Sequence, residues 1–153
     1  MKISTILKTK GTKVHTISST ATLKDMVREM LALHIGSLLV TGPDGGIAGI
    51  ITERNLLRNL ARYSNEWETV AIGEVMNTDI ITASPGDTID HVMGLMTEHR
   101  IRHLPVMEGA QVAGILSMGD IINAALAEST FQNRLLKNYI KNWPDEDEEK
   151  AAG

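Results

Sequence analysis

The chain of 153 residues contains two copies of one sequence pattern, and this repeat limits the possible folds more than any other feature. Residues 22–30 match residues 88–96 at a shift of 66 positions, with apolar side chains at helical spacing. Residues 48–56 match residues 113–121 at a shift of 65, because the first copy has one residue more in its turn. A pattern that recurs in this way predicts two copies of one structural unit that bury their apolar faces together.

Each copy predicts a strand, a helix, two strands joined by a turn, and a second helix, because the period of the apolar residues changes in that order. In the first copy the predicted strands are Val14–Ile17, Ser37–Thr41 and Ile47–Thr52, and the predicted helices are Leu23–Leu33 and Glu53–Tyr63. In the second copy the predicted strands are Ile80–Thr82, Leu104–Met107 and Gln111–Ser117, with helices at Thr88–Glu98 and from Met118 to Trp143. Short helical turns at Thr5–Thr9 and Gly73–Met76 precede the two copies.

One copy alone would leave a sheet face or a helix stripe exposed. We therefore expect an α+β fold, close to α/β, in which two βαββα repeats pack through their sheets with pseudo-two-fold symmetry. The expected segments are residues 1–68 for the first repeat with its lead-in turn, 69–127 for the second repeat, 128–143 for a C-terminal helix extension, and 144–153 for a disordered acidic tail. In the extension, Phe131, Leu135, Tyr139 and Trp143 recur every four residues, which is typical of core or dimer packing.

The composition argues against several classes of protein. The chain has no cysteine, which rules out disulfides, thiolate metal sites and a thiol nucleophile and fits a reducing cytoplasm. No apolar run approaches the roughly 18 residues of a membrane span, and Met1 leads into no signal peptide. A net charge of −4 and an aromatic content of 3% do not fit a nucleic-acid binder. We expect a cytoplasmic protein with no nucleic-acid or membrane partner.

The candidate binding residues of the second copy lie around its hairpin. Arg102 and His103 precede one strand, and Ser117 and Asp120 follow the other. Basic groups suit a phosphate, and a carboxylate can accept hydrogen bonds from both hydroxyls of a ribose. The alternative is that Ser117 or Asp120 only caps the helix that follows, although both roles can coexist. Arg102 and His103 point to opposite faces of a strand, so we expect phosphate contact from at least one of them.

The equivalent positions of the first copy carry different chemistry. Asn55 stands where the second copy has Asp120, and Ser37 stands where it has His103. Asn55 can still hydrogen bond a ribose but brings no charge. Arg54 beside it is either a phosphate ligand or a solvated charge on the helix surface. We therefore predict two unequal sites, of which the first is weaker, empty or specific for another ligand.

With these residues the sequence resembles a tandem pair of cystathionine-β-synthase (CBS) domains, a Bateman module of the stand-alone bacterial or archaeal type. The resemblance covers about residues 1–127 and rests on the duplicated unit, on the strand from Arg102 to Val106, and on a Gly-x-x-Thr/Ser-x-x-Asp signature at 114–120. The first copy departs from that signature at Asn55. The resemblance implies energy or redox sensing through an adenosine ligand held in clefts between the copies, with no required cofactor. AMP is the first candidate, beside ADP, ATP, S-adenosylmethionine and NAD(H).

The resemblance also implies a disc-like homodimer that signals through its own rearrangement or through a regulated protein, which the sequence does not identify. Adenine recognition would use backbone groups of the entering strands, so it leaves little trace in the sequence. The expected nucleotide-binding residues are Thr16, Ile17, Ser37, Thr52, Arg54, Asn55, Ile81, Thr82, Arg102, His103, Leu104, Gly114, Ser117 and Asp120.

The sequence predicts no catalytic site and no metal site. His99 and His103 are four residues apart, but the first is expected at a helix end and the second on the next strand, which does not make a zinc pair. The chain also lacks a glycine-rich phosphate loop and a dinucleotide-binding fingerprint. The alternative to nucleotide sensing is a ligand-free interaction or dimerisation module built on the stripe from Phe131 to Trp143.

Overall fold

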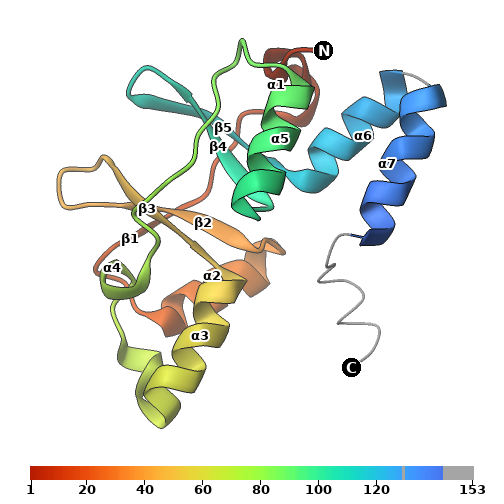
Figure 1. Ribbon diagram of the computed structural model, residues 1–153. Helices are drawn as coiled ribbons and strands as arrows, with labels where there is room; N and C mark the ends of the chain where they lie inside the picture. Colours follow the sequence, from red (N-terminus) through yellow and green to blue (C-terminus); the bar gives the residue numbers. More distant parts are fainter. Residues whose placement is uncertain (129, 143–153) are drawn as a thin grey trace. The chain divides into compact units, whose positions relative to one another are not determined.

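A computed structural model describes residues 1–128 and 130–142 of the chain (Figure 1). The fold is mixed α/β and contains two βαββα-like repeats, as the sequence predicted. The chain forms two compact units. The first-repeat unit is Lys13–Thr82, and the second-repeat unit consists of Met1–Thr12 together with the described residues from Ala83 onward. Packing of the repeats through their sheets stays a prediction.

The first-repeat unit contains a three-stranded sheet in the order β1-β2-β3. Its strands are β1 (Thr16–Ser18), β2 (Ser37–Thr41) and β3 (Ile47–Thr52); β1 pairs with β2 in parallel, and β2 pairs with β3 antiparallel. Its helices are α2 (Leu23–Leu33), α3 (Glu53–Tyr63), the 3₁₀ helix η1 (Ser64–Thr69) and the short α4 (Ile72–Val75). The core is aliphatic and includes Leu23, Met26, Leu38, Val40, Ile51 and Ile72.

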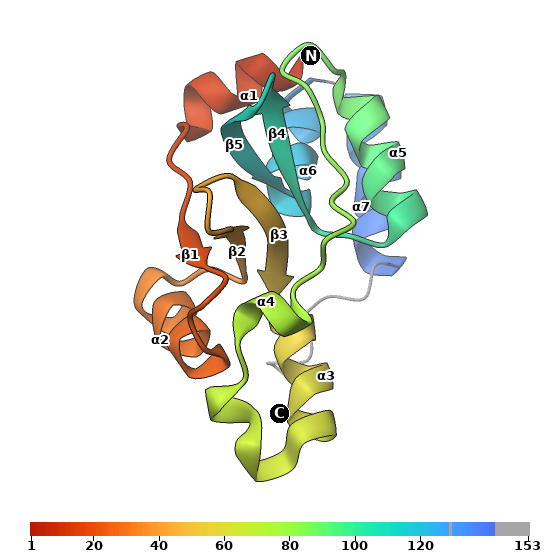
Figure 2. The same cartoon turned by 90° about the vertical axis from the view of Figure 1, so that its left-hand side faces the viewer.

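The second-repeat unit contains a two-stranded antiparallel sheet of β4 (His103–Glu108) and β5 (Gln111–Ser117). Its helices are α1 (Ile3–Lys10), α5 (Ile89–His99), α6 (Met118–Glu128) and α7 (Thr130–Asn142). Figure 2 shows α1 beside the β4–β5 hairpin. Fully buried side chains of this unit include Ile3, Val92, Met96, Leu104, Leu116 and Ile121. No described helix is long and apolar enough to cross a membrane.

The predicted helices Leu23–Leu33 and Glu53–Tyr63 and the predicted hairpin strands of the first repeat are confirmed residue for residue. Apolar residues at helical spacing located the helices, and continuous apolar runs bounded by a glycine-rich turn located the buried strands. Thr22 and Asp25 form a capping box at the start of α2, with both reciprocal hydrogen bonds present.

The predicted strand at Ile80–Thr82 is wrong, because the structure has only a single parallel bridge between Ala83 and Val106 at this place. The reason is a proline. In the first repeat the N–H of Leu39 donates to the carbonyl of His15, 3.4 Å away. Pro105 occupies the position of Leu39 in the second repeat and has no N–H, so it cannot donate the equivalent hydrogen bond.

The predicted single helix from Met118 to Trp143 is also wrong, because the structure has two helices here, α6 and α7. Figures 1 and 2 show α7 lying beside α6 instead of extending it. Leu136 is buried, and the hydroxyls of Tyr139 on α7 and Thr97 on α5 are hydrogen bonded. Leu135 is exposed, whereas Trp143, the side chain of Phe131 and the predicted tail at 144–153 lie outside the described part of the chain.

The segments that lead into the repeats contact the opposite repeat. A bridge joins Lys2 to Thr88 in the second-repeat unit, and an equivalent bridge joins Ala71 to Thr22 in the first-repeat unit. Helix α1 therefore lies with the second repeat and α4 with the first. The compact units therefore differ from the division at 1–68 and 69–127 that was expected from the sequence. Each lead-in segment pairs with the other repeat and not with the repeat that follows it in the chain.

Two glycines allow this close approach of the lead-in segments. A Cβ at Gly114 on β5 would lie 2.7 Å from Cδ2 of Leu7, and a Cβ at Gly49 on β3 would lie 2.7 Å from the sulfur of Met76 and 2.8 Å from the carbonyl oxygen of Asn77. The two positions are equivalent in the repeat. The difference is that Gly49 faces backbone, whereas Gly114 faces the movable end of a side chain.

We predict that Gly49→Ala lowers the free energy of unfolding by about 1–3 kcal/mol, the range for overpacking, and that Gly114→Ala costs less because Leu7 can rotate. Urea unfolding followed by circular dichroism measures both. Gly94→Ala is the control, because Gly94 lies inside α5 with nothing within 4 Å of an added Cβ. It should stabilise the protein by up to about 1 kcal/mol. Equal costs at Gly49 and Gly114 would contradict the argument.

Candidate functional site

Ser117 and Asp120 form a capping box at the junction of β5 and α6. The backbone N–H of Ser117 donates to Oδ2 of Asp120 over 2.8 Å, and the N–H of Asp120 donates to Oγ of Ser117 over 3.1 Å. The capping alternative that the sequence offered is therefore present in the structure. It fixes the side chain of Asp120 in the first turn of α6, where the helix dipole favours a negative charge.

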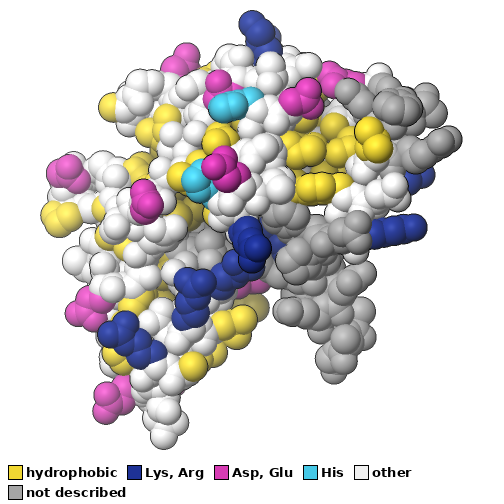
Figure 3. Space-filling model, viewed as in Figure 1, with side chains coloured by type: hydrophobic (Ala, Val, Ile, Leu, Met, Phe, Trp, Pro, Cys, Tyr) yellow, Lys and Arg dark blue, Asp and Glu magenta, His cyan; other side chains and the backbone are white. Residues whose placement is uncertain are grey.

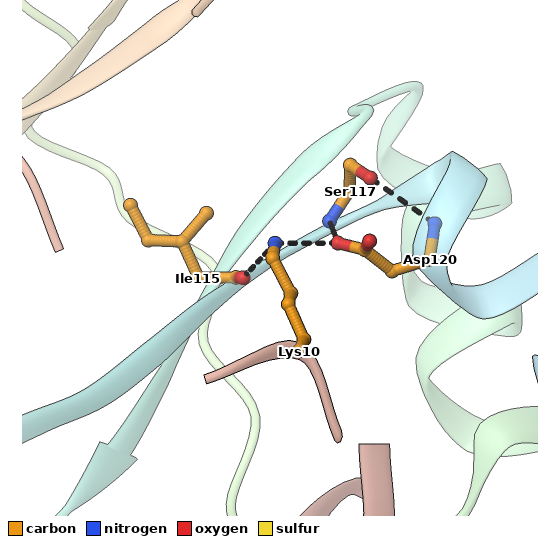
Figure 4. A network of polar contacts seen from close by, with 4 residues as sticks. All are labelled: Lys10, Ile115, Ser117 and Asp120. Atoms are coloured by element: carbon orange, nitrogen blue, oxygen red, sulfur yellow. Dashed lines mark hydrogen bonds and ion pairs between the residues drawn. The ribbon is translucent and has the colours of Figure 1, made fainter. Parts of the chain in front are cut away.

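A third residue, Lys10 at the end of α1, completes this cluster. Its Nζ lies 2.5 Å from Oδ2 of Asp120 and 2.6 Å from the carbonyl oxygen of Ile115 (Figure 4). We refer to Lys10, Ser117 and Asp120 as the α6 cluster. Lys10 was missing from the residues predicted from the sequence. It is 110 positions away from Asp120 along the chain. In the sequence it looks like an ordinary basic residue at a helix C-terminus, where a lysine complements the helix dipole.

The α6 cluster keeps Asp120 ionised. Partial burial raises the pKa of this carboxyl, but the hydrogen bond from Lys10, the hydrogen bonding with Ser117 and the positive charge of Lys10 outweigh it. The pKa of Asp120 therefore lies below its ordinary value of 3.8. At neutral pH the pair consists of a carboxylate and an ammonium in direct contact.

The cluster leaves hydrogen-bonding capacity for a ligand. Both donors to the carboxylate use Oδ2, and none of the described residues donates to Oδ1 of Asp120. An ammonium has three N–H donors, of which Lys10 uses two within the described chain. One acceptor and one donor side by side match two neighbouring hydroxyls of a sugar, since each hydroxyl can donate or accept.

The first repeat has an equivalent cluster without charge. Oδ1 of Asn55 accepts from the N–H of Thr52 over 2.9 Å and from its hydroxyl over 3.0 Å. Nδ2 of Asn55 donates to the carbonyl of Val75 on α4 over 3.3 Å. Asn55 therefore binds a lead-in helix as Asp120 does, through one N–H of its amide, while its Oδ1 is occupied by Thr52. The predicted chemical asymmetry is present in the residues, and its consequence for binding stays a prediction.

The other predicted residues of the second repeat take several positions around the cluster. His103 lies opposite Ser117 in the β4–β5 register, and the carbonyl of Arg102 accepts a hydrogen bond of 2.8 Å from the N–H of Met118. Leu104 is fully buried. Gly114 is buried against Leu7, and its lack of a side chain lets α1 pack closely on β5.

The remaining predicted residues belong to the first-repeat unit. Ser37 is buried and lies opposite Thr52 in the β2–β3 register, next to Asn55. Arg54 is exposed on α3. Strand β1 carries Thr16, which is exposed, and Ile17, which is half-buried.

The last two predicted residues, Ile81 and Thr82, lie in the irregular stretch between α4 and α5. They belong to no regular strand, and Thr82 is exposed. Within residues 1–128 and 130–142, no group of three or more histidines and carboxylates is placed to hold a metal ion.

A family model for the CBS domain matches residues 7–62 and 72–127. The chain therefore belongs to the CBS-domain family, as a tandem pair of these domains.

Three relatives illustrate the similarity. The mitochondrial CBS domain-containing protein CBSX3 of Arabidopsis thaliana is 31% identical over 147 residues, which are 91% of this chain and 71% of that protein. The CBS-domain containing protein ATU1752 of Agrobacterium tumefaciens is 31% identical, with a TM-score of 0.78 over 80% of this chain and 92% of that one. The CBS domain pair of MJ0100 shares the fold at 24% identity and a TM-score of 0.73, over 84% and 98% of the two chains, and was solved with 5′-methylthioadenosine and S-adenosyl-L-methionine.

The lowered pKa of Asp120 predicts a pH-dependent contribution to stability. A carboxyl whose pKa is lower in the folded than in the unfolded state stabilises the fold above the unfolded pKa. This contribution is lost as the pH falls through the folded pKa. We expect Asp120→Asn to cost about 1 kcal/mol at pH 7, the scale of one hydrogen bond. The difference from the wild type should shrink below about pH 4. Urea unfolding between pH 7 and pH 3 tests this, and a pH-independent difference would contradict it.

Proposed function

We propose that this CBS pair is a non-catalytic regulatory module that binds an adenosine nucleotide and passes the signal on through its dimer or a partner protein. AMP is the ligand we expect first, with ADP, ATP and NAD(H) as further candidates. The observation that carries the proposal is the α6 cluster, in which the fixed carboxylate of Asp120 keeps Oδ1 available beside the ammonium of Lys10. A ribose diol can donate to Oδ1 and accept from Nζ.

The ligands in MJ0100 support the chemical class of the proposed ligand. Both 5′-methylthioadenosine and S-adenosyl-L-methionine contain an adenosyl group, and they bind to a protein of the same fold. At 24% identity this likeness concerns the fold, so the choice of ligand rests on the residues of this chain. His103, opposite Ser117, is close enough in the β4–β5 register to contribute to the same site.

Thermal unfolding with and without nucleotide tests the proposal. A ligand at 100 times its dissociation constant adds about 2.7 kcal/mol to the free energy of unfolding if it binds only the folded state. We expect AMP to raise the melting temperature, with inosine monophosphate as a control for the adenine base and 2′,3′-dideoxyadenosine monophosphate as a control for the ribose hydroxyls. If AMP, ATP and NAD all leave the midpoint unchanged, the nucleotide-binding proposal is wrong.

The two repeats should respond differently to substitution. Asp120→Ala removes the carboxylate proposed to bind the ribose, so we expect it to weaken AMP binding by about 1.5–3 kcal/mol, the range for a hydrogen bond to a charged group. Asn55→Ala should have a smaller effect, because the amide of Asn55 is already engaged by Thr52 and Val75. Isothermal titration calorimetry gives the dissociation constants directly. Equal small effects would show that Asp120 is not the principal ribose contact.

A second proposed role, homodimerisation, has its own supporting observation. Leu31 on α2 is 70% exposed and Leu57 on α3 is 64% exposed. Figure 3 shows hydrophobic side chains, in yellow, at the surface in the region of these two helices. A contiguous exposed apolar patch is typical of an interaction surface, and we propose that these two leucines belong to one.

We predict that a second copy covers this surface. Burying one leucine contributes about 1.5–3 kcal/mol, so Leu31→Ser with Leu57→Ser should weaken self-association by at least about tenfold. Sedimentation equilibrium measures this change. The matched control is Leu135→Ser on α7, which is 57% exposed. If only the control variant dissociates, α7 is the dimer surface and this prediction is wrong.

A further inference from the structure

The most unusual element of the α6 cluster is its lysine. Lys10 is the last residue of α1, and its side chain reaches both the carbonyl of Ile115 and the carboxylate of Asp120. The side chains of the pair are 36% and 24% exposed, so water screens their attraction only in part. Their charges cancel, and the start of α6 therefore carries no net side-chain charge from this pair.

The first repeat holds its lead-in segment without a cation. There the backbone N–H of Asn77 donates to the carbonyl of Ile50 over 2.9 Å, and Asn55 donates to the carbonyl of Val75. Ile50 and Ile115 are equivalent residues of the repeat. A neutral donor is therefore sufficient to hold the lead-in segment, and tethering alone does not require a lysine. What differs in the second repeat is the carboxylate of Asp120, whose charge Lys10 balances.

We propose that Lys10 is a specificity-determining residue of the nucleotide site, which cancels the charge of Asp120 and thereby lets the site prefer a phosphorylated adenosine ligand over the free nucleoside. This inference rests on the proposed function. An unbalanced carboxylate that binds a ribose also repels the phosphate attached to the same sugar. The Debye length is about 8 Å at physiological ionic strength, so such a repulsion across one sugar is only weakly screened.

Lys10 acts in two ways in this proposal. Its charge removes the repulsion between Asp120 and the phosphate, and its remaining N–H can donate to the sugar or the phosphate. Both effects depend on a positive charge at residue 10. An arginine can keep that charge, whereas a methionine keeps only the length and the apolar stem.

The test compares the affinities of AMP and adenosine by isothermal titration calorimetry. In Lys10→Met we expect the affinity for AMP to fall by at least about tenfold, because the unbalanced carboxylate of Asp120 repels the phosphate, and the affinity for adenosine to change much less. Lys10→Arg should retain most of the preference for AMP. Lys8→Met is the matched control, because Lys8 is an exposed lysine in the same last turn of α1. It should leave both affinities unchanged.

A double variant separates charge from structure. Lys10→Met with Asp120→Asn makes the start of α6 neutral again, as it is in the first repeat. Both ligands should bind more weakly than to the wild type, but the ratio of the AMP and adenosine affinities should return toward the wild-type ratio. Urea unfolding of each variant shows whether the fold is retained. If the ratio stays as low as in Lys10→Met, charge balance is not the cause and the inference is wrong.

Two further outcomes would overturn the inference. An unchanged AMP-to-adenosine ratio in Lys10→Met would show that Lys10 has no role in specificity, while the proposed nucleotide binding would stand. Tighter binding of both ligands to Lys10→Met would show that Lys10 competes with the ribose for Asp120. If the wild type binds neither AMP nor adenosine, the proposed function itself fails and the inference fails with it.

Discussion

The contact between α1 and the β5–α6 junction is the interaction on which the second-repeat unit depends. Leu7 lies against Gly114, and Lys10 bonds both the end of β5 and the first turn of α6. These bonds join residues more than a hundred positions apart in the chain. Helix α1 therefore supplies three buried apolar side chains, Ile3, Ile6 and Leu7, and one cation to this unit.

The duplication uses one geometry with two sets of chemical groups. In each repeat a capping box lies at the start of the second helix. The side chain of Asn55 or Asp120 in that box also bonds to the lead-in segment. In the first repeat the binding groups are neutral, with Asn55 and backbone amides. In the second they are an ion pair, Asp120 and Lys10.

Local patterns accounted for most of the secondary structure. The helices α2 and α3 agree with the prediction to the residue because their apolar faces recur at helical spacing. The errors have identifiable causes. Pro105 removes the hydrogen bond that a longer first strand in the second repeat would need. The chain from Met118 forms two helices because α7 buries Leu136 and reaches Thr97 on α5, contacts that periodicity alone does not reveal.

The sequence by itself determined the duplication, most of the secondary structure, the family and the residues Ser117 and Asp120 as a candidate site. These properties depend on residue types at fixed local spacing, which a linear chain displays directly. Only the tertiary structure decided that α1 belongs with the second repeat and that Lys10 pairs with Asp120. The physical reason is that an ion pair depends on distance in space, and residues 110 positions apart leave no common pattern in the sequence.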